Sequence, residues 1–339
     1  MKVLLPLVVV IGLSFIAYFG GKVEALQSIF GIVIPYIAFG LFIGGFIHRV
    51  VQWGRTPVPF RIPTTCGQQK SLPWIKHNEI ENPSTTGGVI TRMVLEVFAF
   101  RSLFRNTRTE LKGNSLDHHG DKLLWFAGLV FHWSFLIVIV RHIRLFTDPV
   151  PFFVPWIENL DGFFQVGVPA IFMTGVVLLL AATYLFIRRV IYPQIRYISL
   201  PADYFPLFLV IGIALSGIIM RYFLKVDVVG VKEMMVGLFT LHPVLPEGIG
   251  PIFYLHIFLV SILFGYFPYS KLMHMGGVFL SPTRNMANTT RIKRHINPWD
   301  YPVKVHTYME YEDQYREIMK KRGIPVEKDI PGEEKKEED

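Results

Sequence analysis

The chain has 339 residues, of which 51% are hydrophobic, and its mean hydropathy of +0.40 is too high for an ordinary soluble domain of this length. Its formal charge of +8 comes from lysines and arginines that cluster in polar stretches flanking long apolar runs. This pattern indicates a membrane protein and not a nucleic-acid-binding one. Cys66 is the only cysteine, so the chain alone can form neither a disulfide nor a cysteine-ligated iron–sulfur cluster.

Six stretches are long and apolar enough to cross a membrane as helices. A hydrocarbon core of about 30 Å needs about 20 helical residues, and lone strands cannot satisfy their backbone in lipid. The stretches are 3–20, 29–50, 122–146, 163–188, 204–223 and 250–275. We therefore expect an all-α membrane protein, a six-helix transmembrane bundle. The first stretch could also be a signal peptide, but it lacks a clear small-residue cleavage site, which favours a retained span.

The polar segments predict how the chain is oriented and divided. Lysine and arginine number 11 between Arg49 and Lys122 and 13 from Lys271 onward, but none lies in 147–162. By the positive-inside bias, both termini and the segment 50–121 are expected on the cytoplasmic side of the inner membrane. The expected parts are the N-terminal helix with a short outer loop (1–28), a helical core that includes the 50–121 loop (29–275), and a cytoplasmic tail (276–339).

Four of the eleven histidines lie within the apolar stretches. His132 and His142 are ten residues apart on the third stretch, and His256 and His274 are eighteen apart on the sixth. Four imidazoles in the membrane would each need a polar partner or a ligand. Because the third and sixth helices run in opposite directions, His142 should meet His256 near the outer surface and His132 should meet His274 near the cytoplasmic side. Two bis-histidine hemes fit this arrangement, whereas zinc would need all four rings to converge at one point.

The spacing of the histidines sets the expected heme geometry. Ten helical residues rise about 15 Å and eighteen rise about 27 Å, so the two iron atoms should lie about 20 Å apart. Pro268 interrupts the sixth stretch and should kink it, which would either tilt the inner ligand toward its heme or serve packing only. Gly128, one turn before His132, leaves room for a porphyrin or for a neighbouring helix.

Three arginines lie at the outer level of the predicted bundle, where the charge bias predicts few cations. Arg141 and Arg144 would be explained by something anionic, such as a lipid phosphate or a cofactor carboxylate. Together with Arg221 they could neutralise the propionates of the outer heme. The alternative is that Arg141 and Arg144 extend to the outer lipid headgroups.

The spacings of ten and eighteen residues resemble those of the cytochrome b subunits of the respiratory nitrate reductase gamma family. That resemblance implies a five-helix core in the second to sixth stretches, with the first helix an addition. The stretches 68–77, 100–106 and 297–308 are similar to the DsrM family, the membrane subunits of DsrMKJOP complexes. This implies two heme b groups, a menaquinone site, and a cytoplasmic iron–sulfur subunit of the DsrK type, similar to heterodisulfide reductase, in dissimilatory sulfur metabolism. Residue by residue, the resemblance carries over only the four histidines.

We therefore expect an electron-transfer subunit of an oxidoreductase complex that connects menaquinol or menaquinone with a cytoplasmic partner. The segments 147–162 and 221–249 would form the quinone site near the outer heme, because they combine apolar residues with carboxylates and His242. A transporter could also place histidine and arginine in the membrane, but it should show two similar halves with paired broken helices. A structural anchor would give the histidine spacings no role.

The segment 50–121 is expected to carry the interface with the partner. Its candidate interface residues are Lys76, Arg101, Arg105, Arg108, Trp74, Phe100 and Phe104. Aromatic residues together with arginine favour protein interfaces, and anionic lipid headgroups are the alternative partner for the same cations.

Two further features of this segment are expected to have structural roles. His118 and His119 should solvate the start of the third helix, with Asp117 near its N-cap. Cys66 has no neighbouring cation or base in the sequence, so we expect an idle thiol.

Overall fold

The computed structural model describes residues 2–56, 67–162, 171–281, 283–292 and 305–328. The chain divides into two compact units, Met1–Lys293 and Arg294–Asp339. Cys66 and most of the 297–308 stretch lie outside the described residues.

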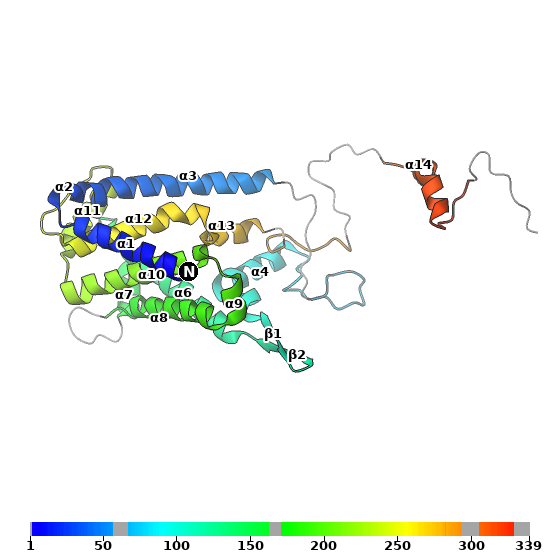
Figure 1. Ribbon diagram of the computed structural model, residues 1–339, viewed down its shortest axis with the longest axis horizontal. Helices are drawn as coiled ribbons and strands as arrows, with labels where there is room; N and C mark the ends of the chain where they lie inside the picture. The colour runs from blue at the N-terminus through cyan, green and yellow to red at the C-terminus, as the bar shows by residue number, and fades with distance from the viewer. Residues whose placement is uncertain (1, 57–66, 163–170, 282, 293–304, 329–339) are drawn as a thin grey trace, which may run out of the picture. The chain divides into compact units, whose positions relative to one another are not determined.

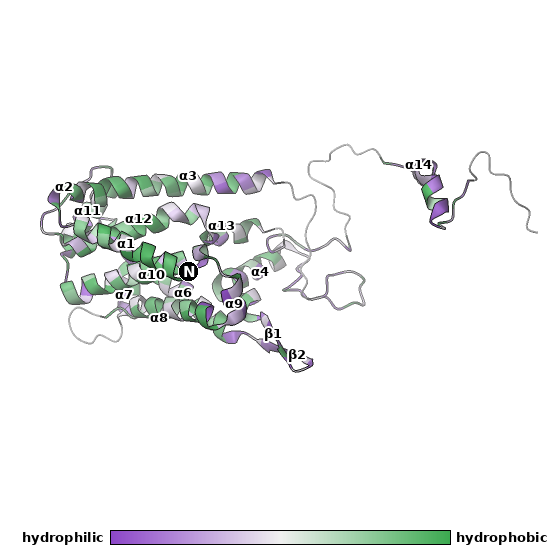
Figure 2. Ribbon diagram, in the orientation of Figure 1, coloured by the Kyte–Doolittle hydropathy of each residue, from purple (hydrophilic) through white to green (hydrophobic). Residues whose placement is uncertain are grey.

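Five helical segments of the first unit are long and apolar enough to cross a membrane (Figures 1 and 2). Their bounds are Glu24–Arg55 (α2, a π turn and α3), Lys122–Leu145 (α6 and a 3-10 turn), Met173–Ile191 (α8), Pro201–Leu224 (α10 and a π turn) and Pro251–Tyr269 (α12 and a 3-10 turn). A shorter apolar helix, α1 (Leu4–Gly20), precedes them. The prediction of an all-α membrane bundle with five core helices and one N-terminal helix is confirmed.

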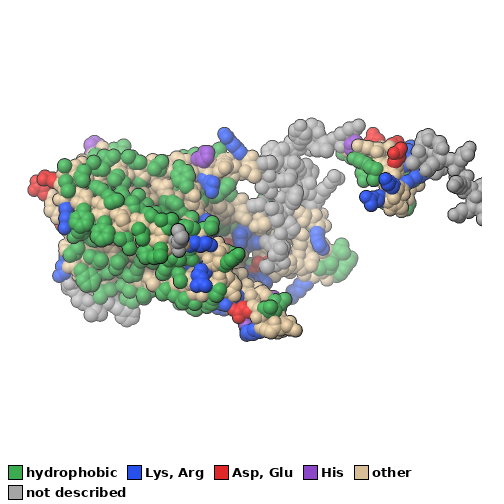
Figure 3. All heavy atoms as spheres, viewed as in Figure 1, with side chains coloured by type: hydrophobic (Ala, Val, Ile, Leu, Met, Phe, Trp, Pro, Cys, Tyr) green, Lys and Arg blue, Asp and Glu red, His purple; other side chains and the backbone are tan. Residues whose placement is uncertain are grey.

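The bundle is apolar both inside and outside. α1 packs on α10 and α12, and Ala17, Leu209 and Tyr254 are fully buried between the helices. Hydrophobic side chains also cover the visible outer face of the helices (Figure 3). Helices that are hydrophobic all round are stable when lipid surrounds them, so this is a multi-pass membrane protein.

Both segments expected as outer loops contain helices. α7 (Phe153–Asp161) lies within 147–162, and α11 (Val228–Phe239) lies within 221–249. α11 begins at Asp227, whose carboxylate accepts hydrogen bonds from the backbone amides of Val229 and Gly230, as an N-cap residue does. The fourth span begins at Met173 and not at 163, and residues 163–170 lie outside the described part of the chain.

The last span is broken, which corrects the expectation of one kinked helix over 250–275. α12 (Pro251–Tyr266) ends two residues before Pro268, since proline cannot donate the next helical hydrogen bond. A 3-10 turn follows (Phe267–Tyr269), and Ser270 is extended (φ −119°, ψ 176°). A second turn (Lys271–Met273) then leads into the short α13 (His274–Gly277) and a turn over Val278–Leu280.

The segment between the second and third predicted spans contains both helices and strands. α4 (Thr86–Ala99) and α5 (Arg101–Phe104) are followed by an antiparallel hairpin of β1 (Thr107–Lys112) and β2 (Ser115–Gly120). His118 and His119 lie on β2, and α6 is capped by Asp121, whose carboxylate accepts from the Leu124 amide at 3.2 Å. The predictions of Asp117 as N-cap and of the two histidines at the helix start are therefore wrong.

This segment is joined to residues 281–292 by buried amides. Asn288 Nδ2 donates to Asn82 Oδ1 at 2.8 Å, and the Asn288 backbone amide donates to the Pro83 carbonyl at 2.7 Å. Both asparagine side chains are fully buried. The first part of the predicted tail is therefore tied into the first unit.

The second unit contains one helix, α14 (Tyr308–Lys321), in its described part. Thr307 and Glu310 form a capping box at its start. The buried Glu312 carboxylate accepts from Arg316 and from the backbone amides of Glu327 and Lys328, so the chain after the helix folds back onto it.

Candidate functional site

The rings of His132 and His274 lie side by side at one end of the bundle. Their centroids are 5.9 Å apart, and the ring planes meet at 84°. Two imidazoles that ligate one heme iron from opposite sides, each with a metal–nitrogen bond of about 2 Å, have centroids separated by about 6 Å. The separation of these two rings therefore matches that of a pair that shares one heme iron.

His142 and His256 form the second pair. His142 ends α6, and it lies within electrostatic reach of His256 on α12. Small residues of α10 adjoin His256: Ser216 is hydrogen-bonded to its ring, and a Cβ added at Gly217 would lie 3.4 Å from its Cε1 atom. The structure thus brings the four histidines together in the two pairs that the sequence predicted.

Each of the four rings is oriented by a hydrogen bond at its Nδ1 atom. His132 Nδ1 contacts the Gly128 carbonyl at 2.7 Å, His142 Nδ1 the Val138 carbonyl at 2.6 Å, and His274 Nδ1 the Lys271 carbonyl at 2.8 Å. A carbonyl can only accept, so these Nδ1 atoms carry the proton and the Nε2 atoms keep a lone pair.

The fourth ring has the same tautomer for a different reason. His256 Nδ1 lies 2.9 Å from Ser216 Oγ, which itself donates to the Ile213 carbonyl at 3.0 Å. The serine oxygen must then accept from Nδ1–H. A fixed Nδ1–H bond that leaves Nε2 free is the arrangement by which proteins prepare histidine as a metal ligand.

The histidine rings remain accessible within apolar surroundings. His132, His142 and His274 are exposed, and His256 is half-buried. The surroundings of His132 are apolar, because the Phe100 and Phe131 rings lie 4.9 and 5.1 Å from its ring. A flat macrocycle needs such accessible ring faces. Gly128 does not contribute to this room, because a Cβ there would meet Leu103 at 3.3 Å, which supports the helix-packing interpretation.

The break in the last span removes a mismatch in the predicted geometry. His132 and His142 are separated by about 15 Å of helix, and α12 likewise ends ten residues, or about 15 Å, after His256. The predicted rise of about 27 Å for a continuous helix is therefore wrong. The chain leaves the helix at the level of His132 and presents His274 from a short separate segment.

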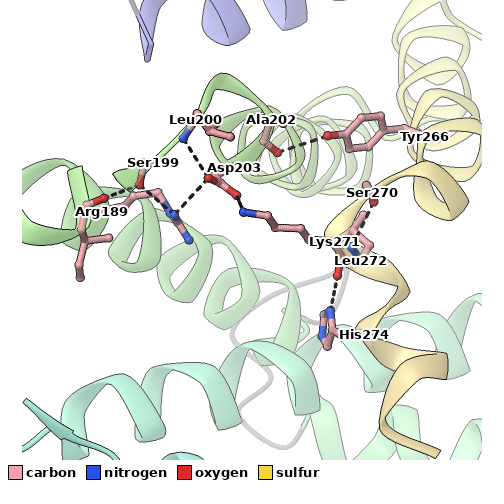
Figure 4. Close-up of polar contacts among 11 residues, drawn as sticks. Arg189, Ser199, Leu200, Ala202, Asp203, Tyr266, Ser270, Lys271, Leu272 and His274 are labelled. Atoms are coloured by element: carbon pink, nitrogen blue, oxygen red, sulfur yellow. Dashed lines mark hydrogen bonds and ion pairs between the residues drawn. The ribbon is translucent and has the colours of Figure 1, made fainter. Parts of the chain in front are cut away.

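A polar network holds this short segment against α10 (Figure 4). Lys271 Nζ lies 2.6 Å from the buried carboxylate of Asp203, and Asp203 also accepts from the Leu200 amide at 2.9 Å. The Lys271 carbonyl accepts the Nδ1 proton of His274. Lys271 therefore connects α10 to the orientation of the histidine, a link that the sequence reading missed.

Two of the three outer arginines have carboxylate partners that the sequence analysis did not assign. Arg141 Nε lies 3.0 Å from Asp161 Oδ2, and Arg144 Nη1 lies 2.7 Å from Glu158 Oε1. Both carboxylates belong to α7. The anionic group expected beside Arg141 and Arg144 is therefore supplied, at least in part, by the protein itself.

Arg221 differs from the other two arginines. Its guanidinium lies over the Phe172 ring at 4.2 Å, and that of Arg141 lies over the same ring at 3.9 Å. Both cations also act electrostatically on His142. The Arg221 Nε atom is buried without a hydrogen-bond partner among the described residues, so this atom could donate to an anionic group beside the outer pair.

The carboxylates and His242 of the segments 147–162 and 221–249, where a quinone site is expected, have different numbers of partners. Asp161 accepts from the Thr174 amide and hydroxyl as well as pairing with Arg141. Asp148 lies 3.3 Å from Lys232, and His242 Nδ1 contacts the Thr240 carbonyl. Glu233 and Glu247 are exposed.

The arginines expected at a partner interface are paired within the chain. Arg101 and Arg105 contact the buried Glu81 carboxylate at 2.9 and 2.7 Å. Burial alone would raise the pKa of Glu81, but the hydrogen bonds from Arg105 and Arg101 outweigh it and hold that pKa below its ordinary value. Charge reversal at Arg101 and Arg105 would therefore disturb the fold of this segment. It would not show whether the two arginines bind a partner subunit.

Among the described residues, no group of three or more His, Cys, Asp or Glu side chains converges on one point. Two separate bis-histidine sites do not require such a group.

Comparison with known proteins decides the family. The sequence pattern of the nitrate reductase gamma subunit family matches residues 89–294, which include all four histidines. The chain belongs to this family. Two relatives are named Hdr-like menaquinol oxidoreductase cytochrome b-like subunit. The relative from Archaeoglobus fulgidus is 46% identical over 279 residues, covering 80% of this chain and 83% of its own length. The relative from Archaeoglobus profundus is 42% identical over 286 residues, covering 82% and 84%.

Proposed function

We propose that this chain is a diheme cytochrome b that exchanges electrons between menaquinol and a partner subunit. One heme b would be held by His142 and His256 and the other by His132 and His274. The observation that carries the proposal is that all four rings are paired and have their protons fixed on Nδ1. When bound, a heme b supplies one-electron chemistry, because its iron alternates between the ferrous and ferric states.

The residues of this chain would bind and orient the two groups. The free Nε2 atoms would ligate iron, and the hydrogen bonds at Nδ1 would hold each ring and strengthen its basicity. Arg221 is the arginine best suited to a propionate of the outer heme, because its buried Nε has no partner in the described chain. Arg141 and Arg144 are placed to assist it, although their charges are already balanced by α7.

The names of the two relatives support menaquinol as the electron donor or acceptor and heterodisulfide-reductase-like subunits as partners. We propose the DsrM-like role within a DsrMKJOP-type complex of dissimilatory sulfur metabolism, with an iron–sulfur subunit of the DsrK type. That partner would dock on the basic side that carries the 67–121 segment, facing the inner pair, with both termini cytoplasmic. Quinol would then react beside the outer pair, near α7 and α11.

Heme content of single variants tests the proposal. Full-length protein purified in detergent should contain two heme b groups per chain and change its spectrum on addition of dithionite. His132→Ala and His274→Ala should lose the same heme, and His142→Ala and His256→Ala should lose the other, so each variant keeps about half of the heme. His242→Ala is the matched control, since this exposed histidine belongs to neither pair, and it should keep both. Loss of the same heme in the His132→Ala and His142→Ala variants would overturn the pairing.

The side of quinol oxidation needs a separate measurement. In proteoliposomes of known orientation, a quinol analogue should reduce the hemes and acidify the side that carries α7 and α11. Proton release on the side of the 67–121 segment would move the quinone site to the inner pair.

A further inference from the structure

The helix α4 exposes apolar side chains and buries charged ones. Ile90, Val94 and Phe98, spaced four residues apart, are 60%, 49% and 52% exposed. Arg92 and Glu96, on the opposite face of the same helix, are buried. A helix of a water-soluble segment shows the reverse pattern, so the outward face of α4 calls for a nonpolar environment.

The two buried polar side chains of α4 have partners within the protein. Arg92 Nη1 donates to the Thr283 carbonyl at 2.8 Å. Glu96 accepts from the Ser102 amide at 3.2 Å and also from the Ser102 hydroxyl. Charged groups can be kept at the level of a membrane when they are buried and paired in this way.

Two tryptophans of α6 fix the depth of α4. The Ala99 carbonyl accepts from Trp125 Nε1 at 2.7 Å, and the Phe98 carbonyl accepts from Trp133 Nε1 at 3.0 Å. Trp125 and Trp133 lie three and eleven residues after Lys122, which corresponds to about 5 and about 16 Å along the span. The C-terminal end of α4 therefore lies about 10 Å inside the end of the membrane-crossing helix, midway between these levels.

The exposed stripe of α4 continues the lipid-facing surface of α6. The Phe98 ring lies 6.0 Å from the ring of Trp133, which is itself exposed on the membrane-crossing helix. Thr91, the polar residue beside the stripe, donates its hydroxyl hydrogen bond to the Gly87 carbonyl of its own helix. The outward face thus presents Ile, Val and Phe with a satisfied hydroxyl, and it lacks the tyrosine and arginine typical of the centre of a protein interface.

We propose that α4 is embedded in the lipid leaflet on the side of the 67–121 segment, with Ile90, Val94 and Phe98 in contact with acyl chains. The helix enters from the aqueous side at its Thr85 cap and ends at Ala99, where Phe100 turns the chain back with a left-handed conformation (φ 49°, ψ 47°). Because the Phe100 ring lies 4.9 Å from the His132 ring, the end of the embedded helix adjoins the inner histidine pair.

Spin labelling of the full chain tests this placement. Cys66→Ala removes the only cysteine, and single cysteines at Ile90, Val94 and Phe98 can then carry a nitroxide in phospholipid vesicles. The exposed Leu136 on α6 is the lipid control, and Asn114 at the tip of the hairpin is the water control. We expect the three α4 sites to behave like Leu136, with high collision rates with oxygen and low rates with a water-soluble nickel chelate. The ratio of the oxygen rate to the nickel rate should increase from Ile90 to Phe98, because Phe98 lies deeper in the leaflet.

The remaining outcomes overturn the proposal. Nickel accessibility equal to that of Asn114 at these sites would show that the stripe faces water. Nickel accessibility that is high in the chain alone and lost when the partner subunit is added would assign the stripe to a protein interface instead. Labelled chains that elute and melt like the Cys66→Ala parent confirm that the fold is retained, and because heme binding is not measured, the result is independent of the proposed function.

Discussion

The ion pair between Lys271 and Asp203 tests how the broken last span holds His274 (Figure 4). Asp203→Asn removes the charge but keeps an oxygen for the Leu200 amide, whereas Asp203→Ala removes both. The Lys271 side chain is 79% exposed, so the pair should contribute at most about 1 kcal/mol. The capping hydrogen bond contributes about another 1 kcal/mol. We expect a loss of stability of about 1 kcal/mol for Asn and about 2 kcal/mol for Ala.

The same variants should act selectively on the inner heme site. Asp203→Asn removes a negative charge near His274 and should raise the midpoint potential of that heme, while Lys271→Met removes a positive charge and should lower it. A redox titration followed optically can resolve both hemes, and the outer heme should be unaffected. Lys112→Met and Asp117→Asn are matched controls, because their ion pair of 2.9 Å lies on the exposed hairpin.

Two results would refute this reasoning. Shifts of the same sign in Asp203→Asn and Lys271→Met would show that the electrostatic account fails. Equal stability of the Asn and Ala variants in thermal unfolding would show that the Leu200 cap makes no contribution.

Three other predictions concern the segment 67–121, which adjoins the inner pair. Because the pKa of Glu81 is lowered in the fold, its ion cluster should stabilise the segment above about pH 4.3, the ordinary glutamate value. This contribution should be lost as the pH falls through the lowered pKa. Limited proteolysis of Glu81→Gln should therefore change less between pH 7 and 3 than that of the parent chain, and an equal change would contradict the reasoning. Asn288→Ala removes the buried hydrogen bond that Asn288 Nδ2 donates to Asn82 Oδ1 and should cost about 1 kcal/mol. It should be seen as faster amide hydrogen exchange in residues 67–105, and unchanged exchange would contradict it. Phe100→Leu removes the edge contact with His132 and should alter the electron paramagnetic resonance signal of the inner heme alone, while Phe15→Leu on α1 should alter neither.

Sequence reasoning predicted the histidine pairs because their spacing is a property of helices. His132 and His142 lie on one uninterrupted helix, and the opposite direction of the sixth stretch then determines which ring meets which. The break at Ser270 could not be placed from Pro268 alone, since proline in a membrane helix can produce either a kink or an end. Whether these histidines ligate heme stays a prediction.

The ion-pair partners of four arginines were missed for a common physical reason. Arg101, Arg105, Arg141 and Arg144 were read from their own surroundings in the sequence, but their carboxylate partners lie 14 to 24 residues away, on elements whose positions depend on tertiary packing. Asp121 could have been recognised as a cap, because it directly precedes the apolar run of α6. The hairpin before it carries hydrophilic strands, and polar alternation of that kind gives only a weak signal.

The interrupted last span also has a consequence for biogenesis. A chain is synthesised from its N-terminus, and its parts fold in that order. His142 and His256 are both on helices that are complete once α12 is inserted, whereas His274 comes later, and the Asn82–Asn288 joint that secures the covering segment comes later still. The His142–His256 pair can therefore form earlier during synthesis than the His132–His274 pair, and the segment 67–121 is secured only after residue 288 has been made.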